Sequence, residues 1–190
     1  MKRILITSGP TWVPIDDVRI ISNRSSGQLG RILTQEFRKR KAYVHLLEGP
    51  LEFNDFLKSL KKEVKNNYDI VIHAAAVSDY QLKKPFKHKL SSQLKSLKLE
   101  FIPTVKIINL IKRIVPYVFL VGFKLEPALT KENVYQKSKR LFEEARCNLV
   151  VANCVKDNKY QGYILHNKSI LAQASSREGI AKELVRILDL

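Results

Sequence analysis

Two serines and a glycine, Ser25, Ser26 and Gly27, directly precede a stretch whose apolar residues recur at helical spacing. Hydroxyls, free backbone N–H groups and the positive end of a helix dipole together favour an anion, typically phosphate. Serine also caps helices routinely, which is the alternative interpretation. Capping does not account for Asn23 and Arg24 just before, or for a glycine in the first turn, where glycine is unfavourable. The segment therefore predicts an anion site.

A second candidate site follows an apolar, strand-like run. Residues 74–76 are alanines, whose small side chains let a ligand approach the backbone closely. Asp79 follows and can accept hydrogen bonds from an exocyclic amine or a ribose hydroxyl. A tight turn with a solvated aspartate is the alternative. The sequence supplies His73, just before the alanines, with no nucleophile or metal partners, so we expect a rim residue without catalytic duty.

A lysine-rich segment comes next, with six lysines and no acidic residue between Tyr80 and Glu100. A solvated surface loop is one interpretation of such a run. A second is a mobile loop that closes over a triphosphate and neutralises its charge. A third is a nucleic-acid contact, although single-strand binding usually adds exposed stacking aromatics. The residues alone leave all three open, and the segment at about 81–93 is the predicted flexible part.

The composition is that of an ordinary globular protein, with 190 residues, 45% hydrophobic and 27% charged. The net charge of +16 favours partners such as nucleic acid, an acidic membrane surface or small anionic substrates. No apolar run reaches the roughly 18 residues of a membrane helix. The apolar segment at the start of the sequence is too short for a signal peptide, so we expect a cytoplasmic protein. Cys147 and Cys154 lack partners for a zinc site and are expected to be reduced and structural.

Apolar patterns predict alternating strands and helices along the chain. Strands are expected over 3–7, 43–47, 69–73, 97–102, 117–122, 148–152 and 162–165, with irregular structure from 8 to about 25. Helices are expected over 25–41, 54–64, 104–114, 131–145 and 177–188, with Asn54 and Thr104 as caps of the second and third.

Such alternation predicts an α/β fold: one Rossmann-like, doubly wound, mainly parallel sheet with helices on both faces, in a single domain over 1–190. Ligands of such sheets bind beyond the carboxyl ends of the strands, where the strand order reverses. This rule places the loops after the first, third and fifth predicted strands on one rim, together with the serine-rich segment and Asn153.

Taken together, these segments resemble the phosphopantothenate–cysteine ligase family, of the DNA/pantothenate metabolism flavoprotein C-terminal domain type. The similar segments are SGPTWVPIDDVRIISNRSSGQLG (8–30), HAAAVSDY (73–80), KHK (87–89), FIPTVKII (101–108), VGFKLE (121–126) and VVAN (150–153). They span nearly the whole chain in the family's order. No flavin-binding decarboxylase half accompanies them, so the chain looks like a stand-alone bacterial synthetase.

The resemblance implies a ligase of coenzyme A biosynthesis. In that family CTP, with Mg²⁺, activates the carboxylate of 4′-phosphopantothenate as an acyl-cytidylate, and the amine of L-cysteine then attacks it. We expect CTP rather than ATP here. Such activation needs no protein nucleophile, only cations around the triphosphate and donors aimed at the developing charge. The family's homodimer is expected as well, with no nucleic acid or membrane as partner.

The family's functional residues carry over by position. The resemblance implies catalytic roles for Asn23 and Lys87. It implies substrate contacts at Arg19, Ser25, Ser26, Gly27, Ala75 and Ala76. It implies nucleotide contacts at Gly9, Asp79, Lys89, Val105, Lys106, Ile107, Ile108, Phe123 and Lys137. Two segments depart from the bifunctional proteins: Leu90 replaces a lysine of the loop motif, and Val105-Lys106 stands where those proteins carry Pro-Asp.

Two rival functions remain on the residues alone. An NAD(P)-dependent oxidoreductase would share the fold, but the loop after the first strand lacks the glycine fingerprint of dinucleotide binding. A basic nucleic-acid-binding module would account for the net charge, and its affinity would fall steeply as salt rises.

Overall fold

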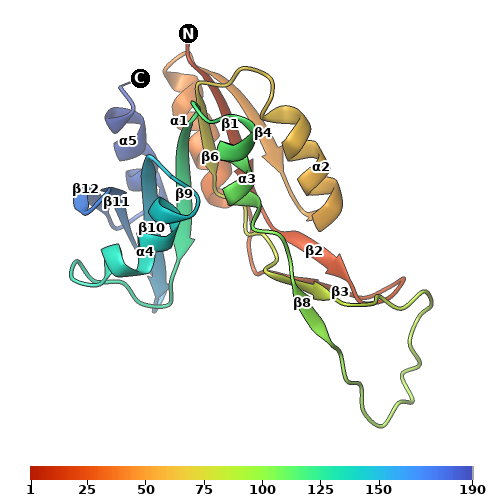
Figure 1. The fold of residues 1–190 in the computed structure, drawn as a ribbon. Helices are drawn as coiled ribbons and strands as arrows, with labels where there is room; N and C mark the ends of the chain where they lie inside the picture. The colour runs from red at the N-terminus through yellow and green to blue at the C-terminus, as the bar shows by residue number, and fades with distance from the viewer. Residues whose placement is uncertain (190) are drawn as a thin grey trace.

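Strands and helices alternate along the chain in the computed structural model, which describes residues 1–189 (Figure 1). The strands are β1 (Arg3–Ser8), β2 (Thr11–Pro14), β3 (Ile20–Ser22), β4 (Tyr43–Glu48), β5 (Leu51–Glu52), β6 (Ile70–His73), β7 (Tyr80–Leu82), β8 (Phe101–Pro103), β9 (Phe119–Leu125), β10 (Leu149–Lys156), β11 (Lys159–His166) and β12 (Ser169–Ala174). The helices are α1 (Gln28–Lys39), α2 (Phe53–Glu63), α3 (Ile107–Ile114), α4 (Val134–Glu143) and α5 (Arg177–Ile187).

The central sheet has the strand order β12-β11-β10-β9-β6-β1-β4. Neighbouring strands from β10 to β4 are parallel, whereas β11 pairs antiparallel with both β10 and β12. The predicted doubly wound, mainly parallel sheet is therefore confirmed. The chain passes from β1 to β4 on one side and then returns to β6 on the other. The strand order thus reverses between β1 and β6, which is where such folds bind ligands.

Helices cover both faces of this sheet because its strands are apolar on both sides. In β1, Ile4 and Ile6 face the side on which α1 and α5 pack, and Leu5 faces the side of α2 and α3. The largest fully buried side chains include Phe37 of α1 and Phe56 of α2. Each such burial contributes roughly 1.5–3 kcal/mol to stability. None of the helices within residues 1–189 is long and apolar enough to cross a membrane.

A smaller group of strands projects away from the central sheet (Figure 1). β2 pairs with β3 and β5, and β7 pairs with β8. Residues 83–100, which contain the lysine run, join β7 to β8 without regular structure. We refer to β2, β3, the turn between them (residues 15–19), β7, β8 and residues 83–100 as the arm.

Several sequence-based boundaries are wrong. The irregular structure expected from 8 to 25 contains β2 and β3, and the strand expected over 97–102 occupies only Phe101–Pro103. β7 and β12 were not predicted either. The strands of the arm have three or four residues, too few to show a periodic pattern, and β12 is an exposed edge strand with little apolar alternation.

Both predicted helix caps are also wrong. The N-cap of α2 is Glu52, whose carboxylate accepts hydrogen bonds from the backbone N–H groups of Asn54 at 2.8 Å and Asp55 at 3.2 Å. The third helix begins at Ile107, and Thr104 instead donates its hydroxyl to the carbonyl of Ser78 at 2.7 Å. Thr104 fits the local signature of a cap, but its partner lies 26 positions away.

Candidate active site

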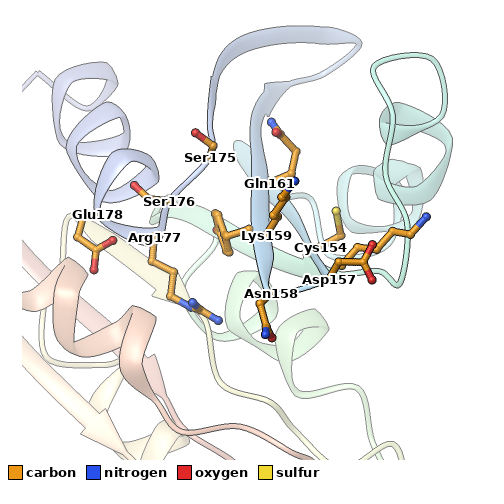
Figure 2. A pocket seen from close by; sticks show the side chains of 11 residues that line it. Cys154, Asp157, Asn158, Lys159, Gln161, Ser175, Ser176, Arg177 and Glu178 are labelled. Atoms are coloured by element: carbon orange, nitrogen blue, oxygen red, sulfur yellow. The ribbon is translucent and has the colours of Figure 1, made fainter.

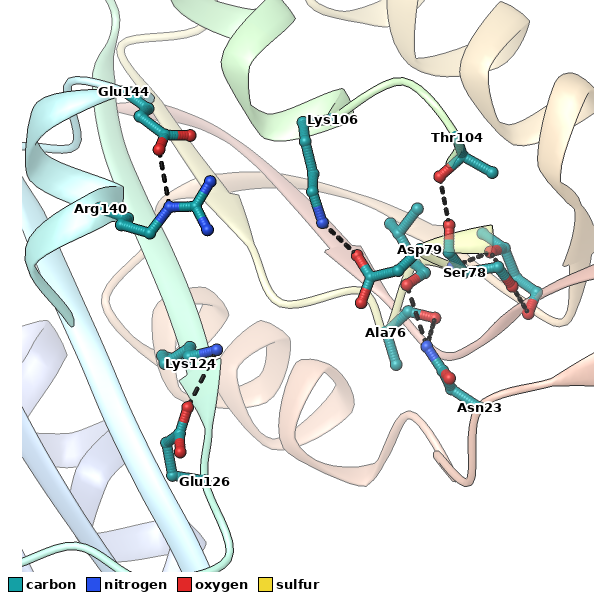
Figure 3. A network of polar contacts seen from close by, with 12 residues as sticks. Asn23, Ala76, Ser78, Asp79, Thr104, Lys106, Lys124, Glu126, Arg140 and Glu144 are labelled. Carbon is teal, nitrogen blue, oxygen red and sulfur yellow. Dashed lines mark hydrogen bonds and ion pairs between the residues drawn. The ribbon is translucent and has the colours of Figure 1, made fainter. Parts of the chain in front are cut away.

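The loops that follow β1 and β6 are joined at the point where the strand order reverses. The backbone N–H of Ala76 donates to the carbonyl of Gly9 at 2.8 Å, and Thr11 N–H donates to the carbonyl of Ala76 at 3.2 Å. The Asn23 side-chain amide donates to the carbonyls of Ala76 at 3.3 Å and Val77 at 2.9 Å (Figure 3). The structure therefore brings the predicted Asn23, Ala76 and Gly9 together, and the Asn23 N–H groups hold the loop after β6.

Helix α1 presents an uncapped N-terminus beside this junction. Its N-cap is Gly27, at φ 71°, with no side-chain cap. The hydroxyls of Ser25 and Ser26 make only long contacts, accepting from Gly27 N–H at 3.5 Å and Gln28 N–H at 3.4 Å. A left-handed φ is costly for any residue but glycine, so Gly27 fits its position. The hydroxyls and N–H groups at this helix end suit an anion, as the sequence predicts.

Arg31 fixes the path of the serine segment, a role that the sequence analysis missed. Its guanidinium pairs with the Glu48 carboxylate at 2.5 Å and donates to the carbonyl of Ser26 at 2.8 Å. Glu48 ends β4, the strand next to β1 in the sheet. The sequence near Arg31 shows only that this residue lies one turn into the helix. Its partner Glu48 lies on β4, 17 positions away, so the pairing cannot be predicted locally.

Close packing of α1 on β1 requires glycine at position 30. A Cβ there would collide with the side chain of the buried Ser8, whose hydroxyl donates to the Gly27 carbonyl at 2.9 Å. Gly30→Ala is therefore expected to lower the free energy of unfolding by about 1–2 kcal/mol, because overpacking outweighs the better helix propensity of alanine. Urea unfolding measures the change.

The matched control is Ser8→Gly combined with Gly30→Ala. Removing the Ser8 side chain makes room for the new methyl group, so the double variant is expected to recover part of the loss relative to the sum of the two single changes. Strict additivity of the two changes would contradict the packing explanation.

A cavity of about 250 Å³ opens on the α3 and α4 side of the sheet. The predicted residues that line it are Ala75, Asp79, Val105, Lys106, Ile107, Ile108, Phe123 and Lys137. The residues that line it without having been predicted are Val77, Ser78, Thr104, Asn109, Lys124, Arg140, Leu141 and Glu144, together with His73 at its base. The structure thus gathers the predicted nucleotide contacts of four separate segments in one place.

Basic side chains around this cavity are paired with acids (Figure 3). Lys106 pairs with Asp79 at 2.5 Å, and Arg140 with Glu144 at 2.7 Å. Glu126 pairs with both Lys124, at 3.0 Å, and Lys137, at 3.6 Å. Most of these bases are exposed, so they can turn toward a bound phosphate at small cost.

Glu126 keeps its charge in this network. Burial acts to raise its pKa, but hydrogen bonds and charges from Lys124 and Lys137 outweigh burial, so the pKa lies below its ordinary value. Hydrogen bonding and charge from Arg140 lower the pKa of Glu144 in the same way. Both acids therefore remain anionic counter-ions at neutral pH.

Nine predicted residues do not line the cavity. Six of them lie at the loop junction and the start of α1, namely Gly9, Asn23, Ser25, Ser26, Gly27 and Ala76. The other three lie elsewhere. Lys87 and Lys89 lie on the exposed part of the arm. Arg19 forms an ion pair with Asp16 at 2.5 Å. The structure therefore separates these arm residues from the residues gathered at the switch point.

The family model for the DNA/pantothenate metabolism flavoprotein C-terminal domain matches residues 1–186. This chain belongs to that family. The coenzyme A biosynthesis bifunctional protein CoaBC of Thermococcus kodakarensis is 38% identical over 82% of this chain and 42% of its own length. The DNA/pantothenate metabolism flavoprotein of Streptococcus pneumoniae superposes with a TM-score of 0.87, at 25% identity, over 100% of this chain and 99% of that one.

A Cab2 variant in complex with phosphopantothenate-cysteine shares the fold of this flavoprotein C-terminal domain. The TM-score is 0.80 over 99% of this chain and 86% of that one, at 20% identity, which shows the fold alone. The chain also spans less than half of the length of the Thermococcus protein.

A larger cavity in this flavoprotein C-terminal domain, of about 640 Å³, lies between the β10–β11 hairpin and the start of α5 (Figure 2). Its lining includes Lys159, Tyr160 and Arg177 and none of the predicted site residues. It shares no residue with the cavity beside Asp79. The predicted site residues therefore do not gather at the larger of these two cavities.

Proposed function

We propose that this chain joins 4′-phosphopantothenate to L-cysteine through an acyl-nucleotide intermediate. The observation that carries the proposal is the junction at the switch point, where Asn23 holds the loop after β6 between the uncapped start of α1 and the base-lined cavity. The start of α1 suits an anionic group of the substrate, and the cavity suits a nucleotide. The relatives support the reaction, because they include coenzyme A biosynthesis proteins and a complex with phosphopantothenate-cysteine.

The proposed chemistry has two steps. The substrate carboxylate attacks the α-phosphate of the nucleotide and pyrophosphate leaves. The cysteine amine then attacks the acyl carbon and the nucleoside monophosphate leaves as the amide forms. Charge develops on phosphate oxygens in the first step, and the bases Lys106, Lys124 and Lys137 around the cavity can stabilise it.

The cavity beside Asp79 is proposed as the nucleotide site. Asp79 can accept a hydrogen bond from the exocyclic amine of cytosine through Oδ2, because the Lys106 ammonium bonds only Oδ1. CTP is proposed over ATP on the family resemblance. Within the described residues no three acidic, His or Cys side chains are grouped to hold a metal ion. Mg²⁺ is therefore proposed to enter with the triphosphate, whose oxygens it prefers, and no protein ligand is assigned.

Release of pyrophosphate tests this proposal. The protein, phosphopantothenate, cysteine and Mg²⁺ are mixed with CTP or ATP, and pyrophosphate is measured by a coupled assay. We expect release that depends on phosphopantothenate and is faster with CTP. Mass spectrometry should find phosphopantothenoylcysteine. No release with either nucleotide would contradict the proposed function, and faster release with ATP would contradict the nucleotide preference.

The rival oxidoreductase function is not favoured by the geometry of β4. A dinucleotide-binding fold uses an acidic residue near the end of its second strand for the ribose hydroxyls. Glu48 stands at that place but is bonded to Arg31, which also holds Ser26. Its carboxylate therefore already has a partner within the protein.

A homodimer is proposed as the working form, with location in the cytoplasm. The arm carries exposed apolar side chains, including Val18, Ile20, Tyr80 and Phe101. A second copy could cover them, since exposed apolar groups on a projecting element are typical of interfaces. Sedimentation at micromolar concentration tests this, and a fully active monomer would contradict it.

Lys87 is proposed to neutralise the triphosphate during activation. Lys87→Gln is expected to slow pyrophosphate release about a hundredfold without changing the thermal unfolding midpoint, because Lys87 is exposed and contributes no core. Lys95→Gln, on the same exposed segment, is the matched control and should keep normal release. An unchanged rate of pyrophosphate release in Lys87→Gln would contradict the proposed role of Lys87.

A further inference from the structure

One buried carboxylate lies where the arm folds back on itself. Asp16 stands in the turn between β2 and β3, and its side chain is 0% exposed, which is unusual for an acid. Oδ1 accepts from Val18 N–H at 2.9 Å and Arg19 N–H at 2.7 Å. Oδ2 accepts from Leu90 N–H at 3.0 Å and from the Arg19 guanidinium at 2.5 Å. The Leu90 bond is the main cause that holds the pKa of Asp16 well below its usual range.

Leu90 is bound through both of its backbone groups. Its N–H donates to Asp16, and its carbonyl accepts two hydrogen bonds from the Arg19 guanidinium, at 3.2 and 3.3 Å. A second anchor lies four residues earlier, where Phe86 N–H donates to the carbonyl of Ile15 at 2.9 Å. Lys87 and Lys89 therefore lie between two points that are fixed to the same turn.

Closing the β2–β3 turn explains only half of this arrangement. Oδ1 accepts from the backbone N–H groups of Val18 and Arg19, which are the bonds that such a turn requires. Oδ2 is directed to a residue 74 positions away. Hydrogen bonds to an ionised acceptor are stronger than neutral ones, so Asp16 is well suited to hold the lysine segment.

We infer that Asp16 is a positioning residue that sets where Lys87 and Lys89 are presented to the nucleotide phosphates. This inference rests on the proposed function, in which those lysines contact the triphosphate. A segment freed from its anchor spends less time in the competent position, and the apparent affinity for the nucleotide falls by that fraction. Saturating nucleotide restores the position, so the maximal rate is preserved.

The test compares Asp16→Asn with Asp17→Asn. Asp17 is the neighbouring carboxylate, 61% exposed, and its contact with His88 is long, at 3.9 Å. Asp16→Asn is expected to raise the KM for CTP about tenfold with kcat unchanged, as for one lost charge-assisted hydrogen bond. Trypsin should cut the ligand-free variant after Lys87 and Lys89 about tenfold faster than the wild type. Asp17→Asn should match the wild type in both measurements.

A second variant keeps the test decisive if Asp16→Asn does not fold. Leu90→Pro removes the N–H donor and leaves Asp16 in place, so it should raise KM and tryptic cleavage in the same way. Wild-type KM and wild-type cleavage in either folded variant would overturn the inference, as would a loss confined to kcat. If the wild-type protein releases no pyrophosphate, the proposed function fails, while the cleavage rates still decide whether Asp16 anchors the segment.

Discussion

Replacing Asn23 with aspartate is expected to slow amide formation about a hundredfold while the acyl-nucleotide still forms, since loss of one oriented donor costs on the order of 3 kcal/mol. The Asn23 N–H groups bond the carbonyls of Ala76 and Val77, so an aspartate would place a negative charge against both oxygens. In the wild-type protein these two bonds leave Oδ1 of Asn23 available to accept from the attacking amine. The intermediate should therefore accumulate, and mass spectrometry of quenched reactions would detect it.

The control for Asn23→Asp is Asn158→Asp, in the turn of the β10–β11 hairpin. Asn158 has φ 58°, a conformation that asparagine and aspartate both tolerate, and it lies outside the cavity beside Asp79. This variant should form amide at the normal rate. We propose that Asn23 acts in the second step, the attack of the cysteine amine on the acyl carbon. If Asn23→Asp blocks acyl-nucleotide and amide formation equally, Asn23 acts in the first step and this proposal is wrong.

Acidification is expected to destabilise the protein through His73. Burial lowers the pKa of His73 to about 4 from the ordinary 6.5, and its Nδ1 lies 2.8 Å from the Thr7 hydroxyl. In the unfolded chain His73 therefore takes up a proton below pH 6.5, whereas in the folded protein it stays neutral down to about pH 4. The free energy of unfolding falls across this window, by about 2 kcal/mol at pH 5, and the contribution is constant above it.

Urea unfolding at pH 7.5 and pH 5 measures this effect. His73→Asn keeps a polar atom near the Nδ1 position but cannot titrate, so its stability should fall less between the two pH values than that of the wild type. His166→Asn replaces an exposed histidine of β11 and should retain the wild-type pH dependence. Equal pH dependence in His73→Asn and the wild type would rule out His73 as the cause.

The sequence alone determined the order of the helices and of the parallel strands of the central sheet, and with it the type of sheet. Apolar runs such as Arg3–Thr7 and Asp69–His73 show the strands, and residues such as Leu33 and Phe37 show the helical face of α1. Each pattern depends on neighbours within a few positions, so it can be read locally. The rule that ligands bind at the carboxyl ends of such strands then places Ser25–Gly27 and Asp79 on one rim.

Tertiary structure alone decided which of these side chains are partners. Asp16 bonds Leu90, Arg31 bonds Glu48, and Lys106 bonds Asp79, across separations of 74, 17 and 27 positions. Thr104 was taken for a helix cap for the same reason, because its partner Ser78 lies 26 positions away. The strands β2, β3 and β7 were missed because three or four residues show no periodic pattern. A periodic pattern records which face of an element is buried, whereas a hydrogen bond between distant residues depends on how the loops bring their backbones together.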